Sequence, residues 1–367
     1  MLIHPSAYTT NTAPWQAVLG AVAQTWPPFA LVAGLLLIGF VAAGDGVFAW
    51  AGSRIAAFRG GPAVLFTGLL GLVALVTATL NLDTSVVFLT PLLLEAARCR
   101  GLDERPFLYG TVLMSNSASL LLPGSNLTNL LVLAASPVSG GDYALRMLLP
   151  WIATVGVTWL VVWAAYRRFL RRNGRSQHQS VRMRGRLGAV AIVIAVGLVL
   201  LLRNPAVPVL GLGVGVAAWC LVGRRIEARR LLGAMNPVTL AALFAGAVLL
   251  GTLARSWGLP ATLMSSANAW QSTALGASAA VALNNLPAAL LLSSSPPAHP
   301  LFLLLGLDLG PNLAVTGALS AVLWMRVARR HGAMVSAVAY SRLGSAVAVL
   351  CLAAAAACLS IACCSAP

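Results

Sequence analysis

The sequence predicts an all-α, polytopic membrane protein. Of its 367 residues, 59% are hydrophobic and only 9% are charged, and the mean hydropathy is +0.88. A soluble domain carries about 25% charged residues, and a disordered chain has low hydrophobicity, so both classes are excluded. Because a membrane-spanning helix needs about 20 apolar residues, the chain has room for about eight to ten spans and little else.

Arginine supplies all of the positive side-chain charge. The 24 basic residues include no lysine and oppose only 8 acidic residues, which gives a formal charge of +16. The arginines fall in short gaps between apolar runs, as in the cytoplasmic loops of bacterial inner-membrane proteins. The most basic gap, at 167–186, is therefore expected in the cytoplasm. A nucleic-acid-binding face would interleave its basic residues with aromatic or polar ones, so we expect no nucleic-acid partner.

The first half of the chain begins with a polar stretch and one plain span. Residues 1–26 hold only a short apolar piece, so we expect an interfacial segment there, followed by a span at 27–50. Residues 62–97 are apolar but interrupted at 81–84, and they have arginine at both flanks. This pattern predicts a re-entrant hairpin that enters and leaves the membrane on the cytoplasmic side.

The hairpin is followed by a broken helix and a full span. Residues 107–134 are interrupted by PGSNLTN at 123–129. The gap at 135–144 has no arginine, which places it outside the cell. Residues 145–166 then return to the basic cytoplasmic loop.

The second half repeats this order after three plain spans, at 187–202, 206–223 and 237–254. Residues 260–298 are broken at 284–287 and carry no arginine, which predicts a hairpin entered from outside. Residues 301–327 are broken at 308–312, and a last span is expected at 334–362.

Each half therefore contains a broken hairpin followed by a broken helix, and the arginines place the two hairpins on opposite sides of the membrane. Such an inverted-topology repeat is the architecture of secondary transporters. We assign the first repeat to 27–166 and the second to 187–362, with a C-terminal tail at 363–367. Interrupted backbone at membrane depth must line protein or a water-filled cavity, so the four breaks should converge on one substrate site.

Polar side chains concentrate at these breaks. Amide and hydroxyl groups there offer neutral donors and acceptors, and the ends of half-helices offer free N–H groups. Such a set suits a small oxyanion or a polyhydroxylated neutral solute. The candidate substrate-binding residues are Asn81, Thr84, Ser125, Asn126, Thr128, Asn129, Asn284, Asn285 and Asn312.

One aspartate lies at a break in each half, Asp83 in the first and Asp308 in the second. Ionisable residues inside a membrane are costly and usually mark ion or proton paths. We therefore expect both to take part in proton coupling. The alternative is that each only caps the half-helix that follows it.

The sequence contains no pattern typical of a metal site or an enzyme. Its four histidines lack ligand spacing, and its six cysteines show no CxxC pair. Nucleotide-binding and hydrolase motifs are also absent. We therefore expect a transporter with no catalytic residues, no metal site and no cofactor, and we assign no role to Cys363 and Cys364.

The segments around the breaks resemble one family. VALVTATLNLDTSVVFLTPLLLEA (73–96), ASLLLPGSNLTNLLV (118–132), NNLPAALLL (284–292) and LGLDLGPNLAVTGALSAVLW (305–324) are similar to the arsenite/antimonite efflux permeases. These arsenical pump membrane proteins belong to the ion transporter superfamily. The similarity extends from about residue 26 to 355. NNLP and SNLTN alone are shared with relatives that move sodium or dicarboxylates.

The resemblance implies export of arsenite or antimonite in exchange for protons, and in some members docking with a cytoplasmic, arsenite-stimulated ATPase. Near neutral pH arsenite is mostly an uncharged trihydroxide, which suits a cradle of amides and hydroxyls. Two positions depart from the family pattern. Asn116 stands where the resemblance leads us to expect Asp, and Asn312 where it leads us to expect Lys.

Two other functions remain open on the sequence. One is a sodium-coupled antiporter or small-anion carrier of the same superfamily. The other is a membrane-embedded scaffold or sensor subunit that transports nothing itself.

Overall fold

All regular secondary structure in the described part of the chain is helical. The computed structural model describes residues 14–58, 60–135, 138–170, 181–235 and 237–364. Within them, five helical stretches are long and apolar enough to cross a membrane, and three shorter apolar helices accompany them. The predicted all-α, polytopic membrane fold is confirmed.

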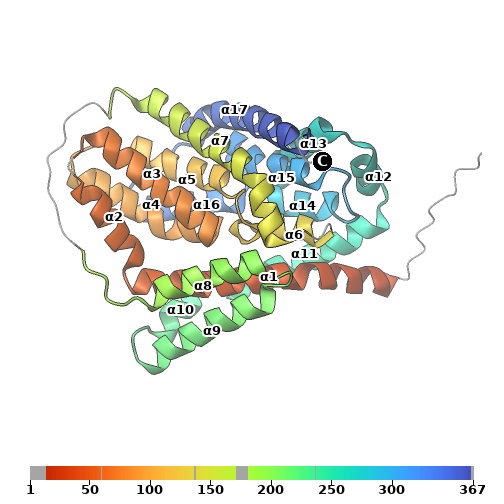
Figure 1. The fold of residues 1–367 in the computed structure, drawn as a ribbon, viewed down its shortest axis with the longest axis horizontal. Coiled ribbons are helices and arrows are strands. Elements are labelled where there is room, and N and C mark those ends of the chain that lie inside the picture. Colours follow the sequence, from red (N-terminus) through yellow and green to blue (C-terminus); the bar gives the residue numbers. More distant parts are fainter. Residues whose placement is uncertain (1–13, 59, 136–137, 171–180, 236, 365–367) are drawn as a thin grey trace, which may run out of the picture.

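The first half contains one hairpin, one broken helix and one long helix (Figure 1). The α3–α4 pair forms the hairpin, α5, η1 and α6 form the broken helix, and α7 follows as a full span. The bounds are α1 Pro14–Gly44, α2 Val47–Ala57, α3 Pro62–Thr79, α4 Leu82–Cys99, α5 Arg105–Ala118, η1 Pro123–Ser125, α6 Leu127–Ala135 and α7 Gly140–Tyr166.

The same order recurs in the second half. Helices α13 and α14 form the hairpin, α15 to α16 the broken helix, and α17 the full span. The bounds are α8 Leu187–Leu201, α9 Ala206–Val222, α10 Ala228–Met235, α11 Pro237–Ser256, α12 Leu259–Ser266, α13 Ala269–Leu283, α14 Asn285–Leu292, α15 Pro300–Leu309, η2 Gly310–Leu313, η3 Val315–Gly317, α16 Leu319–Arg330 and α17 Ala337–Cys364.

The two hairpins enter the molecule from opposite ends. In Figure 1 α3 and α4 lie at the left, α13 and α14 lie at the right, and the breaks of both hairpins point toward the middle. The contacts cross between the halves, since α4 packs on α16, α14 packs on α6, and α7 packs along α17. The predicted inverted arrangement is therefore confirmed, whereas the exact bounds of the two repeats stay a prediction.

Glycines set the closest helix contacts. A Cβ on Gly34 of α1 would lie 2.6 Å from the Val209 carbonyl oxygen of α9, and one on Gly213 would lie 2.6 Å from the Gly34 carbonyl oxygen. In α13, a Cβ on Gly276 would meet the Leu303 carbonyl oxygen of α15 at 2.8 Å. Helices in lipid associate through such small residues because no hydrophobic effect drives them together.

Asparagines make the two hairpin breaks. The Asn81 Oδ1 accepts a hydrogen bond from the Thr84 N–H at 2.7 Å and so caps α4. At the other break Asn284 has a φ of 84°, which few residues other than glycine and asparagine adopt. The Asn284 N–H still closes α13, while its Oδ1 accepts from the Leu286 N–H of α14. Both breaks lie where the polar residues of the sequence predict them.

Three expectations from the sequence need correction. Residues 14–26 are not a separate interfacial segment, because they form the first turns of α1 and the helix continues through Pro27 and Pro28. The first span ends at Gly44, before the short helix α2. The break of the second broken helix begins within the predicted 308–312 but is longer, since α15 runs to Leu309 and regular α-helix resumes only at Leu319. Residues 1–13 lie outside the described residues.

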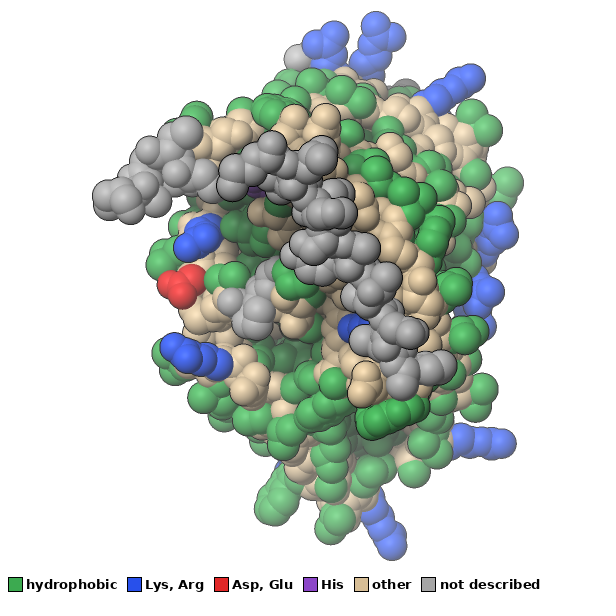
Figure 2. Space-filling view, turned by 90° about the vertical axis from the view of Figure 1, so that its right-hand side faces the viewer, with side chains coloured by type: hydrophobic (Ala, Val, Ile, Leu, Met, Phe, Trp, Pro, Cys, Tyr) green, Lys and Arg blue, Asp and Glu red, His purple; other side chains and the backbone are tan. Residues whose placement is uncertain are grey.

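The end of the molecule at the right of Figure 1 faces the viewer in Figure 2. Its visible surface is mostly hydrophobic or uncharged, with isolated arginine side chains and little acidic surface. The basic turn between α9 and α10 and the turn between α4 and α5 lie at the opposite, left-hand end. This asymmetry agrees with the cytoplasmic loops that the arginines predict.

Candidate functional site

A buried carboxylate joins the two broken helices. Asp308, in the last turn of α15, has only 1% of its surface exposed. Its Oδ1 accepts hydrogen bonds from the Asn126 Nδ2 at 2.8 Å and from the Thr128 hydroxyl at 2.7 Å. Asn126 ends the break of the first broken helix, and Thr128 lies in the first turn of α6. Three of the predicted site residues, 180 or more positions apart across the two halves, therefore meet.

The second oxygen of this carboxylate is unused by the protein. Among the described residues, nothing donates a hydrogen bond to the Asp308 Oδ2. The Asn129 Oδ1 and the Tyr143 hydroxyl are also buried without a hydrogen-bond partner, and the side chains of both residues lie near enough to Asp308 to interact with its carboxylate. Buried polar atoms are normally paired with protein or ordered water. A carboxylate oxygen without a partner, with two other unpaired polar groups near the same carboxylate, is typical of a place that holds an ion, water or solute.

Two further predicted residues, Ser125 and Asn129, hold the break of the first broken helix together. The Ser125 hydroxyl donates to the Ser119 and Leu122 carbonyl oxygens. The Asn129 Nδ2 donates to the Ser119 carbonyl oxygen at 2.8 Å. The Ser119 carbonyl lies just past the end of α5, where the interrupted helix supplies no backbone donor, so the two side chains supply the missing hydrogen bonds.

A second polar group lies between the same two helices. The Asn116 Nδ2 donates to the Asn312 Oδ1 at 2.7 Å, and the Asn312 Nδ2 donates to the Ser117 hydroxyl at 3.3 Å. The Tyr340 hydroxyl of α17 donates to the Pro311 carbonyl oxygen at 2.9 Å. Asn312 is therefore a buried, bonded residue of the interface between the halves.

The hairpin tips hold the remaining candidates. The Asn81 Nδ2 and the Thr84 hydroxyl are buried without a hydrogen-bond partner among the described residues. The Asn284 Nδ2 donates to the Thr316 carbonyl oxygen at 3.1 Å and so ties the second hairpin to the neighbouring break. Asn285 is buried beside it, with 6% of its surface exposed.

The structure gives the two predicted coupling aspartates different surroundings. Asp83 lies in the first turn of α4, where Asn81 is the cap, and it is partly exposed. No hydrogen bond from the described residues reaches Asp83. Asp308 does not cap a following helix either, because it lies inside the end of α15. Neither aspartate is therefore the simple helix cap that the sequence left open.

Sequence reasoning missed several members of these groups. The sequence marks Asn116 only as a departure from a family pattern, and it gives Ser117, Tyr143 and Tyr340 no role. A signal for Asn116 and Ser117 exists, because SNSAS at 115–119 is a polar run within an otherwise apolar stretch. The two tyrosines belong to long apolar helices, and no local pattern marks them.

The comparisons with known proteins agree on the fold and the class. The family model described as a citrate transporter, CitMHS, matches residues 9–362. The crystal structure of the YdaH transporter of Alcanivorax borkumensis, described as having an unusual topology, is similar with a TM-score of 0.61. That match covers 95% of this chain and 87% of the other at 15% identity.

These matches confirm the secondary transporter expected from the sequence, and the family model names citrate where the resemblance at the breaks pointed to arsenite or antimonite. The chain belongs to the CitMHS citrate-transporter family, and the protein is a multi-pass membrane transporter rather than an enzyme.

Proposed function

We propose that the protein carries a small carboxylate of the citrate type across the membrane by alternating access, together with a cation that binds at Asp308. One observation carries this proposal: a buried carboxylate joins the two broken helices through one oxygen and leaves the other oxygen unpaired. The family match supplies the class of substrate. The setting we propose is a bacterial inner membrane.

The charge of the site argues for a coupled cation. Neither the groups bonded to Asp308 nor the Asn116–Asn312 pair includes an arginine. An anionic substrate beside a buried aspartate would therefore meet repulsion, which is about 4 kcal/mol for two unit charges 4 Å apart at an effective dielectric constant of 20. A proton or metal cation on the free Asp308 oxygen would remove that repulsion. Substrate and cation would then have to move together.

The remaining candidates supply neutral hydrogen bonds in this proposal. The unpaired Asn81 Nδ2 and Asn129 Oδ1 and the Thr84 hydroxyl can bond carboxylate and hydroxyl groups of the solute. Asn284 and Asn285 would close the site from the second hairpin. Asp83, on the opposite hairpin, is proposed as a second group on the path of the coupling ion.

Arsenite or antimonite export is the second candidate. The observation that favours it is the same lack of cationic side chains around Asp308 and Asn312, because an uncharged trihydroxide needs only neutral donors and acceptors. Proton exchange and a cytoplasmic ATPase partner belong to this candidate. The two candidates differ in the charge of the solute, and transport assays can separate them.

The test is uptake into proteoliposomes that contain the purified protein. Radiolabelled citrate uptake is measured with an imposed gradient of protons, of sodium or of magnesium, and arsenite is offered in parallel. We expect cation-driven citrate uptake, loss of that uptake in Asp308→Asn, and retention in Asp142→Asn, which makes the same change at an exposed residue of α7.

Citrate uptake that is unchanged in Asp308→Asn would contradict the proposed cation site. Arsenite exchange without citrate uptake would favour the second candidate. If neither solute moves, unimpaired tolerance of arsenite in cells that carry Asn126→Ala or Asn285→Ala would point to a scaffold or sensor.

A further inference from the structure

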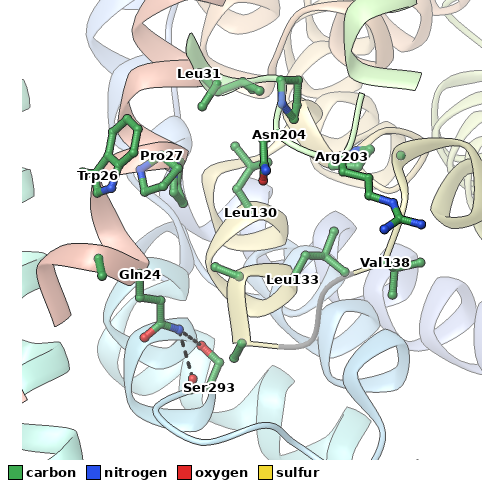
Figure 3. A pocket seen from close by; sticks show the side chains of 18 of the residues that line it. Gln24, Trp26, Pro27, Leu31, Leu130, Leu133, Val138, Arg203, Asn204 and Ser293 are labelled. Carbon is green, nitrogen blue, oxygen red and sulfur yellow. Dashed lines mark hydrogen bonds between the residues drawn. The ribbon is translucent and has the colours of Figure 1, made fainter. Parts of the chain in front are cut away.

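A cavity of about 570 Å³ lies apart from the Asp308 group, between α1, α6, the end of α14 and the turn that joins α8 to α9. In Figure 3 Gln24 reaches from α1 toward Ser293, whereas Arg203 and Asn204 lie on the opposite rim. Its polar lining residues include Gln24, Arg203, Asn204, Arg255, Ser293 and Ser294. The other walls are largely apolar.

The cavity contains a cation without a counter-ion. Arg255, at the end of α11, is half-buried, and its guanidinium donates to the Gln24 Oε1 at 2.5 Å and to the Gly251 and Gly20 carbonyl oxygens. All three acceptors are neutral. None of the eight acidic residues of the chain, all of them described, lines the cavity or pairs with Arg255. A partly desolvated charge is costly unless an opposite charge compensates it.

The amide of Gln24 connects this cation to the moving parts expected of a transporter. The Gln24 Nε2 donates to the Leu131 carbonyl oxygen at 3.1 Å and to the Ser293 carbonyl oxygen at 3.0 Å. These acceptors lie in α6 and at the end of α14, the second arms of the first broken helix and the second hairpin. A ligand on Arg255 would therefore touch a network that holds both arms.

Helix α6 separates the cavity from the buried carboxylate. Leu130, Leu133 and Ala134 line the cavity, at the spacing of one helix face. Thr128, in the first turn of the same helix, bonds Asp308. The cavity and the Asp308 group therefore lie on two sides of one short helix, and the cavity extends along that helix to Pro123 in the break.

The chemistry of the lining selects an oxyanion. A guanidinium carries a permanent charge and five N–H donors, and the contacts of Arg255 with Gln24, Gly251 and Gly20 use three of them, so two remain for an oxygen of a carboxylate or phosphate. Arg203 adds a second positive charge at the rim, and Ser293, Ser294 and Asn204 add neutral donors. Apolar walls strengthen such electrostatic interactions because they lower the local dielectric constant.

The geometry points to a second binding site in this cavity, where Arg255 and Arg203 hold a dissolved small oxyanion such as a carboxylate on the way to the central site. Only the identity of the ligand, a citrate-type anion, rests on the proposed function. The turn at 202–205 and residues 138–140, which line the cavity, lie on the side expected to be external. The site would therefore receive the anion from outside.

The test measures binding, by isothermal titration calorimetry, of citrate and of inorganic phosphate to the purified protein in a buffer without sodium or magnesium, where no metal cation offsets the repulsion at Asp308 in the central site. We expect one anion to bind, and Arg255→Gln to weaken that binding by about 10- to 100-fold, as for loss of a charged hydrogen bond. Arg255→Lys should have an intermediate effect, because it keeps the charge and has fewer N–H donors than the guanidinium. The matched control is Arg146→Gln, an exposed arginine of α7 that does not line the cavity.

Anion binding that is equal in Arg255→Gln and Arg146→Gln would overturn the inference. So would binding of phosphatidylglycerol in mixed micelles that depends on Arg255 while neither free anion binds, because the site would then belong to a lipid headgroup. If Arg255→Gln does not fold, as judged by size-exclusion chromatography, the Arg255→Lys and Arg203→Gln proteins decide in its place. Binding that depends on Arg255, in a protein that transports no citrate, would leave this site standing and refute only the proposed function.

Discussion

Asn116 and Asn312 are bonded side chain to side chain across the two halves of the protein, at 2.7 Å and 196 positions apart. The pair is completed by Ser320, whose hydroxyl donates to the Asn116 Oδ1 at 3.4 Å, and by Ser117. Both asparagines occupy positions where the resemblance to arsenite permeases leads us to expect opposite charges. The two asparagines are in contact in the structure, so this chain lacks both members of the oppositely charged pair that the resemblance leads us to expect.

This pairing predicts that charges can be introduced only together. Asn116→Asp alone, or Asn312→Lys alone, leaves an uncompensated buried charge, which costs about 3–5 kcal/mol. The double variant should regain most of that loss because the two charges would face each other. The measurements are the midpoint of thermal unfolding in detergent and the yield of monodisperse protein for each variant. A double variant as unstable as the sum of the two single variants would contradict the pairing.

Asp83 provides a prediction about coupling. Asp83→Asn should abolish transport driven by a pH gradient, because an amide cannot carry a proton, and uptake into inverted vesicles should fall to the level of empty vesicles. Asp103→Asn is the control. A hydrogen bond from Arg105 lowers the pKa of the Asp103 carboxyl, so this group stays charged near neutral pH and carries no coupling proton. Proton-driven uptake that persists in Asp83→Asn would remove this residue from the coupling path.

The close approach of α13 and α15 predicts a sensitive glycine. A Cβ on Gly306 would meet the Ala277 nitrogen at 2.7 Å as well as the Thr273 carbonyl oxygen, so Gly306→Ala must push the helices apart. Overpacking of this kind costs about 1–3 kcal/mol. Gly246→Ala is the control, because nothing lies within 4 Å of its added Cβ. Thermal unfolding of both variants in detergent should show a lower midpoint for Gly306→Ala only.

The sequence was sufficient for the elements whose signal is local. Asn81 and Asn284 interrupt long apolar runs, and both hairpins break where they stand. The start of α1 was missed because Pro27 and Pro28 look like a helix boundary, although a membrane helix tolerates proline where neighbouring groups satisfy its backbone. The run DLGPN predicts a break that starts at Asp308, whereas Asp308 and Leu309 still belong to α15 and the break starts at Gly310.

The contacts between the halves could not be predicted from one sequence. Nothing local to Asp308 indicates that Asn126 and Thr128 will hold it, because those residues lie 180 or more positions away and meet it only through the fold. The contact between Arg255 and Gln24 could not be predicted from the sequence either. A single arginine after an apolar run is typical of a loop, and only the packing of α1 on α11 places it against Gln24.

Two reporter fusions test the orientation in the membrane. A reporter fused after residue 175 should report the cytoplasm, and one placed at residue 138 should report the outside, because arginines crowd the first loop and are missing from the second. Residue 175 lies outside the described residues, whereas Val138 lines the cavity that contains Arg255. Paired alkaline phosphatase and green fluorescent protein fusions give opposite signals on the two sides. The same signal from both positions would refute the predicted topology and the external mouth of the cavity.

The cysteines give the last prediction, which bears on the choice of solute. Cys351 is linked to the central groups by one residue, since its thiol lies 3.4 Å from the Thr158 hydroxyl, which in turn donates to the Ser117 hydroxyl. Serine can keep that hydrogen bond, and no described cysteine bonds Asp308 or Asn312. Replacing all six cysteines by serine should therefore leave transport largely intact. Transport is measured in proteoliposomes with citrate and with arsenite. Complete loss of arsenite transport with citrate transport intact would mean that thiolates, rather than amides and hydroxyls, bind the metalloid.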